Sequence, residues 1–147
     1  NGVNVIFIEE PVNGPPSAAN AALNSAMRTL SEENPDDFGY PDYNTQDKVL
    51  YVNLATPRGE ELYAGLKIPE GARVVVRKGA HSITELDAIT RKAYDVIPEF
   101  YEGSIDGKND RVVMTSPSVS RDLLRRVKEH FGPDLVAVRW QPFGHTN

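Results

Sequence analysis

The sequence contains no cysteine, and this absence excludes disulfide bonds, zinc–thiolate sites and thiol nucleophiles. It also lacks any apolar run that approaches the roughly 20 residues of a membrane-spanning helix. Basic residues are in the minority, because 16 Lys and Arg stand against 21 Asp and Glu and leave a net charge of −5. Nucleic acid is therefore not an expected partner, since phosphate binding needs a concentrated basic face.

The common signatures of catalysis and cofactor binding are missing as well. No Gly-x-Gly-x-x-Gly or Gly-x4-Gly-Lys-Ser/Thr motif is present, and no Gly-x-Ser-x-Gly elbow surrounds a serine. The three histidines and the carboxylates show no spacing that is typical of a metal site. We therefore predict no cofactor, no metal and no catalytic residue, and we expect that the protein is not an enzyme.

What the sequence does contain is a repeated pattern. The first copy runs from Lys48 through Thr56-Pro57 to a closing run at residues 73–77, and the second runs from Arg111 through Ser116-Pro117 to residues 135–140. Each copy predicts a strand, a helix that begins at Thr-Pro or Ser-Pro, a glycine stop and a closing strand. The copies lie about 60 residues apart, a spacing that is typical of duplicated supersecondary units.

This pattern predicts an α+β fold. We expect duplicated hairpin–helix–strand units, with an antiparallel sheet or sheets and with helices packed on one face. The predicted segments are an N-terminal strand and helix at residues 1–35, the first unit at 36–80, a linking helix at 81–98, the second unit at 99–141 and a mobile tail at 142–147. The linking helix begins with a capping box at Ser82 and Glu85.

The second copy carries a resemblance to a known family. The run Gly-Ser-Ile-Asp-Gly-Lys-Asn-Asp-Arg-Val-Val-Met begins at Gly103, and a helix, Phe131-Gly132 and the strand Asp-Leu-Val-Ala-Val-Arg follow it. This resembles the pro-region module of exported actinobacterial serine proteases of the streptogrisin and alpha-lytic type. The first copy looks more like uncharacterised exported actinobacterial proteins, and the likeness covers roughly residues 36–140.

The resemblance implies a module that helps a protease to fold and then inhibits it. No protease domain is present in these residues, so no catalytic residue of the family is carried over. The leading hypothesis is a non-catalytic, secreted or cell-envelope protein, with its signal peptide removed, that binds a protein partner such as a secreted serine protease. Strand addition at residues 135–140 and the tail is the expected mode of binding.

The candidate partner-binding residues combine arginines and aromatic residues. Arginine forks suit carboxylates, and tryptophan is enriched among binding hot spots. The candidates are Arg121, Arg125, Arg139, Trp140 and Phe143. The alternative for the arginines is a solvated helix face, and for Trp140 a cap on the core.

Two other classes of function remain open. One is a hydrolase or metal-binding enzyme that uses His81 with the acidic region at residues 36–47, which includes Asp36, Asp37, Asp42 and Asp47. The other is a purely structural or cell-envelope module. Plainer interpretations exist for each residue: His81 flanks a helix, His130 favours a helix C-terminus, Ser116 is a helix cap, and the acidic region is a solvated surface.

Overall fold

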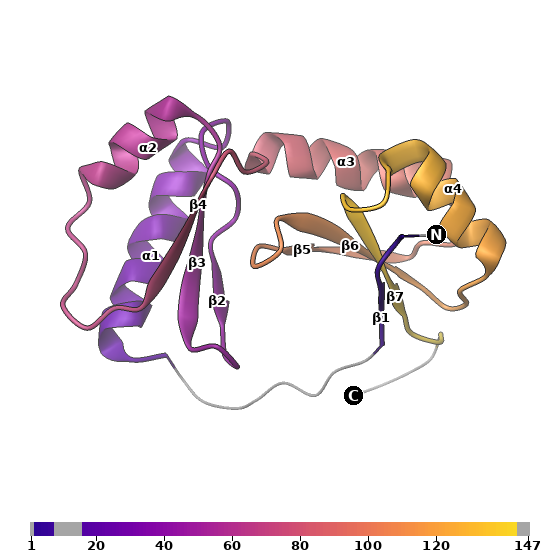
Figure 1. Cartoon of the computed structure of the whole chain (residues 1–147), viewed down its shortest axis with the longest axis horizontal. Helices are drawn as coiled ribbons and strands as arrows, with labels where there is room; N and C mark the ends of the chain where they lie inside the picture. The colour runs from indigo at the N-terminus through magenta and orange to yellow at the C-terminus, as the bar shows by residue number, and fades with distance from the viewer. Residues whose placement is uncertain (1, 8–15, 144–147) are drawn as a thin grey trace. The chain divides into compact units, whose positions relative to one another are not determined.

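The computed structural model describes residues 2–7 and 16–143 of the chain. In chain order the elements are β1 (Val5–Ile6), α1 (Ala18–Glu33), β2 (Asp42–Asn44), β3 (Val49–Leu54), α2 (Pro57–Ala64), β4 (Val74–Lys78), α3 (Ile83–Val96), β5 (Glu102–Asp106), β6 (Arg111–Ser116), α4 (Arg121–Phe131) and β7 (Val136–Trp140) (Figure 1). None of the described helices is both long and apolar enough to cross a membrane.

The elements form two compact units. The three-stranded unit contains α1, β2, β3, α2, β4, the start of α3 and the turn residues Gly107–Asp110. The four-stranded unit contains β1, the rest of α3, β5, β6, α4 and β7. Each unit has its own sheet and is described separately below.

The sheet of the three-stranded unit has the order β2-β3-β4. Strand β2 is antiparallel to β3, and β4 is parallel to β3 because α2 returns the chain between them. The predicted start of α2 is confirmed: the Thr56 hydroxyl accepts a hydrogen bond from the Gly59 N–H, and Pro57 follows at the first helical position.

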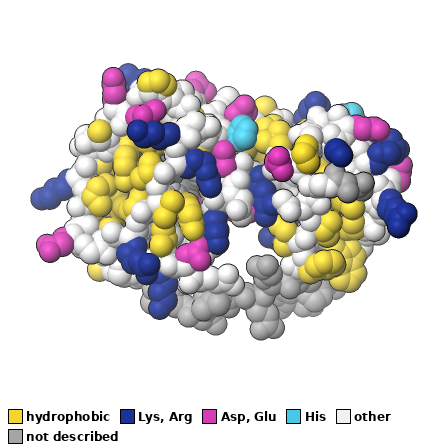
Figure 2. Space-filling model, viewed as in Figure 1, with side chains coloured by type: hydrophobic (Ala, Val, Ile, Leu, Met, Phe, Trp, Pro, Cys, Tyr) yellow, Lys and Arg dark blue, Asp and Glu magenta, His cyan; other side chains and the backbone are white. Residues whose placement is uncertain are grey.

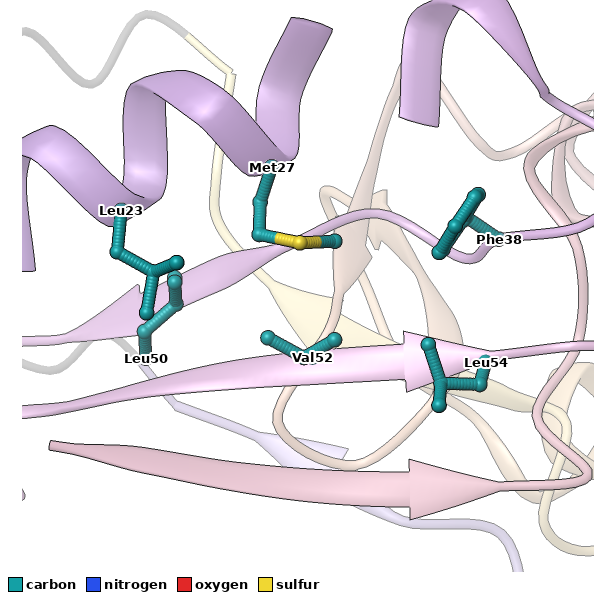
Figure 3. Packing of buried hydrophobic residues seen from close by; sticks show 6 residues of the cluster. All are labelled: Leu23, Met27, Phe38, Leu50, Val52 and Leu54. Carbon is teal, nitrogen blue, oxygen red and sulfur yellow. The ribbon is translucent and has the colours of Figure 1, made fainter. Parts of the chain in front are cut away.

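Alternation along β3 places the core of this unit. Leu50, Val52 and Leu54 point to one face, where Leu23 and Met27 of α1 descend onto them (Figure 3). Phe38 closes the cluster at one end, and side chains of α2 pack around its margin. Both helices thus cover the same face, as predicted. Full burial of each such side chain stabilises the fold by about 1.5–3 kcal/mol.

The sheet of the four-stranded unit has the order β1-β7-β6-β5. Strands β5 and β6 form an antiparallel hairpin, whereas β7 runs parallel to β6 and β1 runs parallel to β7. Helix α3 packs closely on the hairpin, because a Cβ atom at Gly103 would come within 3.2 Å of Thr90 Cγ2. Leu123 and Val127 of α4 are buried.

The α+β class is confirmed, with one correction to the predicted sheets. Both sheets are mixed rather than antiparallel, since each closing strand follows a helical crossover and therefore runs parallel to the strand before the helix. The order hairpin, helix, parallel strand occurs in both units. Helix α1 precedes the first hairpin as α3 precedes the second, so the repeated order begins one helix earlier than the sequence suggested.

A second correction concerns the edges of the sheets. The sequence predicted an open edge at residues 135–140, but β7 lies inside its sheet because β1 pairs with it. The strand of the other unit that corresponds to β7 is β4, which is at an edge. The tail predicted at residues 142–147 is described only as far as Phe143, and the rest lies outside the described residues.

Candidate functional site

Exposed aromatic side chains line one end of the four-stranded sheet. Tyr101 directly precedes β5, and its N–H donates to the Thr115 carbonyl at 3.0 Å, while the β6–β7 register pairs the neighbouring Ser116 with Trp140. Phe7 follows β1 directly and lies beside Trp140. These residues therefore lie at the same end of the four-stranded sheet. We call Phe7, Tyr101 and Trp140, together with Phe143, the aromatic row.

The members of the aromatic row contact one another in pairs. The rings of Phe7 and Trp140 meet edge to face, with centroids 6.4 Å apart and planes 66° apart. The rings of Tyr101 and Phe143 have centroids 4.8 Å apart and are tilted by 42°. Both separations lie in the favourable range for aromatic pairs. The structure thus brings the predicted residues Trp140 and Phe143 into one aromatic surface.

The polar groups of the row are bonded to the main chain. Trp140 Nε1–H donates to the Pro117 carbonyl at 3.1 Å, and the Tyr101 hydroxyl donates to the Gln141 carbonyl at 2.8 Å. These bonds orient both rings. They also satisfy the indole and phenol groups, so that covering the rings would leave neither group without a hydrogen-bond partner.

The aromatic row is accessible to solvent. Phe143 is 70% exposed, Phe7 is 65% exposed and Trp140 is 39% exposed. Hydrophobic side chains gather near β1 and β7 on the face shown in Figure 2. Adjacent exposed aromatic side chains are typical of surfaces that bind other proteins, because tryptophan and tyrosine supply much of the energy of such contacts.

The predicted arginines occupy different environments. Arg125 donates to Asp122 at 2.5 Å and to Glu129 at 2.7 Å, so its guanidinium is held on its own helix. Arg121 is exposed at the first residue of α4. Arg139 points to the face of β7 opposite Trp140, because side chains alternate along a strand. Among the described residues, no hydrogen bond, ion pair or cation–π contact joins these three arginines to the aromatic row.

Arg126, which the sequence analysis did not select, makes the most extensive ion pairs. Its Nη1 donates to Glu99 at 3.0 Å, its Nη2 contacts the other oxygen of Glu99, and its Nε donates to Asp122 at 2.9 Å. The hydrogen bond from Arg126 holds the pKa of Glu99 below its usual value. This network ties α4 to the segment before β5 and explains Arg126 as a structural residue.

A polar cluster in the three-stranded unit holds the turn Gly107–Asp110. The buried Asn53 amide donates to the Gly107 carbonyl at 2.9 Å and to the Tyr40 carbonyl at 3.0 Å. Arg77 donates to Asn53 Oδ1 at 2.7 Å and to the Lys108 carbonyl at 2.6 Å. We call Asn53 and Arg77 the turn clamp. Both Asn53 amide donors go to main-chain carbonyls, and the Arg77 guanidinium donates to Asn53 and to the carbonyls of Gly107 and Lys108.

The acidic region contributes to the same turn. Asp42 accepts the Lys108 N–H at 2.9 Å, and Asp47 lies 2.8 Å from Lys108 Nζ. The Tyr51 hydroxyl donates to Asp47 at 2.7 Å. The hydrogen bond from Lys108, followed by that from Tyr51, lowers the pKa of Asp47. A Cβ at Gly107 would lie 2.6 Å from Asp42 Cβ, so this position requires glycine.

His81 pairs with Asp110 and not with the acidic region. Its Nδ1 lies 2.9 Å from Asp110 Oδ2, and the same carboxylate accepts the His81 main-chain N–H at 3.1 Å. Asp110 has a φ of +53°, a backbone conformation that suits the end of a tight turn. Asp37 is bonded to the Thr56 hydroxyl at 2.6 Å. Within the described residues, no group of three His, Asp or Glu side chains is placed to hold a metal ion.

Comparisons with protein-family models, curated proteins and solved structures found no match to this chain.

Sequence reasoning selected half of the aromatic row and missed the rest. Trp140 and Phe143 stood out as the last aromatic residues of the chain, whereas Phe7 and Tyr101 were assigned to predicted strands. The missing information was the strand pairing, which brings Phe7 to the same end of the sheet as residues more than 90 positions later. Nothing in the local sequence indicates that the short apolar segment near residue 5 pairs with β7.

Proposed function

We propose that this protein is a non-catalytic, exported protein-interaction module that binds a partner protein through the aromatic row. The exposure of Phe7 beside Trp140, and of Phe143 beside Tyr101, at one end of the same sheet is the observation that carries the proposal. Large rings that are already oriented lose little conformational freedom when a partner covers them.

The expected partner is a secreted serine protease of the chymotrypsin type, which the module would assist in folding or inhibit. The likeness of residues 103–140 to protease pro-regions supports this choice of partner. The negative net charge and the ion-paired state of Arg125 favour an apolar contact over one based on arginine forks. A secreted or cell-envelope location belongs to the same proposal.

The direct test measures inhibition and complex formation with a panel of secreted chymotrypsin-like proteases. The purified protein is expected to slow at least one of them and to co-elute with it in gel filtration. Trp140→Ala is expected to weaken this binding about 30-fold or more, which corresponds to a hot-spot loss of about 2 kcal/mol. Refolding of the denatured protease, with and without the protein, tests the folding role in parallel.

Two matched variants control for general effects. Tyr94→Ala removes an exposed aromatic side chain from α3 that is not part of the aromatic row, and it should leave binding unchanged. His81→Ala should also leave binding unchanged, because His81 and its partner Asp110 both belong to the three-stranded unit, which does not contain the aromatic row. If no protease of the panel is slowed or bound, the protease proposal fails. If Trp140→Ala binds like the natural protein, the aromatic row is the wrong surface.

A further inference from the structure

Strand β4 has one hydrogen-bonding edge without a partner in the described part of the chain. The Leu50 N–H donates to the Arg73 carbonyl at 2.9 Å, so this carbonyl faces β3, and the β3–β4 register pairs Leu50 with Val74. Because main-chain groups alternate in direction along a strand, those of Val74, Val76 and Lys78 face away from β3. No described residue forms a hydrogen bond with these outward groups.

The other unit shows what fills the corresponding edge. In the four-stranded unit, β1 pairs in parallel with the outer edge of β7, with Val5 opposite Val138. The Val138 N–H donates to the Asn4 carbonyl at 2.9 Å. Val138 and Val76 hold the same place in the two repeats, since each lies opposite the fourth residue of the preceding strand. In the four-stranded unit a short apolar strand thus pairs with the outer edge of the closing strand. In the three-stranded unit the same edge has no partner strand among the described residues.

The side chains of β4 define the chemistry of an added strand. Val75 is 45% exposed and Val76 is 40% exposed, one on each face of the sheet. Figure 2 shows hydrophobic side chains gathered over β4, with Lys and Arg side chains beside them. Lys78 is held only by an exposed pair with Glu60 at 3.4 Å, which is a weak interaction that can exchange. These features favour a segment with apolar residues followed by carboxylates.

We propose that the outer edge of β4 binds an extended segment of another protein, which adds in parallel as β1 adds to β7. The segment carries β-branched or aromatic residues opposite Val74–Lys78 and acidic residues at the end that lies near Lys78. This inference extends the proposed function, because it gives the interaction module a second contact. It uses no residue of the aromatic row, so the two contacts can fail independently.

The probe is a synthetic peptide with the sequence of residues 2–10, Gly-Val-Asn-Val-Ile-Phe-Ile-Glu-Glu, which has this chemistry. Titration of the full-length, isotope-labelled protein is expected to shift the amide signals of Val74, Val76 and Lys78 and to slow their hydrogen exchange. Val76→Pro removes the central outward N–H, and proline is tolerated where a strand's N–H faces solvent. It should weaken peptide binding at least tenfold, whereas the control Val76→Thr should keep it.

Separate outcomes overturn the inference. It fails if the peptide does not bind, if Val76→Pro binds it as well as Val76→Thr does, or if the shifts occur along β7 because the peptide has displaced β1. It also fails if sedimentation shows a dimer that Val76→Pro abolishes, since the occupant is then a second copy. Protection of β3 amides in Val76→Pro verifies that the sheet is intact. Trp140→Ala should bind the peptide normally, whichever way the protease test ends.

Discussion

At the scale of single residues, the buried Asn53 amide is the side chain that fixes the positions of the most neighbouring polar groups. Buried polar groups must find partners, and this side chain has three: it donates to two carbonyls and accepts from Arg77. The geometry fixes which amide atom is the oxygen, because guanidinium groups only donate. An apolar residue at this position would remove all three hydrogen bonds at once.

Replacing this side chain therefore has a predictable cost. Asn53→Ala is expected to lower the free energy of unfolding by about 3 kcal/mol, because it removes three hydrogen bonds that are buried or partly buried. Urea unfolding followed by circular dichroism measures the change. Gln46→Ala, at an exposed position of the β2–β3 turn, is the control and should change stability little. A loss below about 1 kcal/mol for Asn53→Ala would contradict the role assigned to the turn clamp.

The Glu99–Arg126 pair predicts how stability depends on pH. Arg126 lowers the pKa of Glu99 below its ordinary value of 4.5, so the folded protein releases this proton more readily than the unfolded chain does. The stabilisation is therefore complete above pH 4.5 and is lost as the pH falls through the lowered pKa. The pKa values of Asp122 and Asp47 are lowered as well, by Arg125 and Lys108 respectively, and act in the same direction.

Glu99→Gln tests this pH dependence. The variant should be less stable than the natural protein at pH 7, and the difference should shrink as the pH falls below 4.5, where Glu99 itself becomes protonated. Urea midpoints at pH 7 and at acidic pH provide the measurement. Glu102→Gln, at an exposed position on β5, should not alter the pH dependence. An identical acid profile for Glu99→Gln would show that the ion pair does not stabilise the fold.

At the scale of elements, the helix starts were only partly predictable. Thr56 caps α2 as expected, and Ser17 caps α1 in the same way, because the hydroxyl pattern is local. Ser116 was predicted to cap the next helix, and this was wrong. Ser116 ends β6 and is buried, and its hydroxyl donates to the Ser118 carbonyl, while Ser120 caps α4. Ser116, Ser118 and Ser120 all match the local N-cap pattern. Ser116 is not the cap because it belongs to the buried strand β6, whereas Ser120 directly precedes α4.

The two roles can be separated by substitution. Ser120→Ala removes the acceptor for the Leu123 N–H, a bond of 3.0 Å, and is expected to lower stability by about 1 kcal/mol. Ser118→Ala, two residues earlier at an exposed position, should have little effect and is the matched control. Thermal unfolding of both variants provides the comparison. Equal effects of the two substitutions would mean that the cap at Ser120 contributes nothing.

The directions of the strands needed information beyond local patterns. Both predicted hairpins are present, since tight turns are encoded within a few positions. The closing strands were expected to complete antiparallel sheets, although a strand that follows a helical crossover runs parallel to its neighbour. This rule could have been applied to the sequence. The pairing of β1 with β7 could not have been, because nothing local to either strand encodes it.

At the scale of the whole molecule, the repeat was the most reliable feature of the sequence. Helices and strands occur in the same order in both units, because each unit repeats the same hydrophobic periodicity and the same stops. The candidate site was less predictable. The alternative of a hydrolase that uses His81 with residues 36–47 stays a hypothesis, and the structure adds a contact of the His81 ring with Asp110, which lies 29 positions away in the chain.

The lack of cysteine allows a direct test of burial across the molecule. Single cysteines at Val75 and at Val52 place one thiol on the exposed edge of β4 and one in the core. Val75→Cys should react with a thiol reagent at nearly the rate of the unfolded protein, whereas Val52→Cys should be strongly protected, because only an opened state exposes it. Similar rates at both positions in the folded protein would contradict the exposure assigned to Val75 and the burial assigned to Val52.

The pairing of β1 with β7 also determines when the four-stranded sheet can be completed during synthesis. A ribosome makes β1 about 130 positions before β7, and loops of that length close slowly compared with hairpins. The segment that completes one sheet must therefore wait until the whole intervening chain has been made. During that interval β1 is an unpaired apolar strand, and a chaperone or another incompletely synthesised chain can bind it before β7 does.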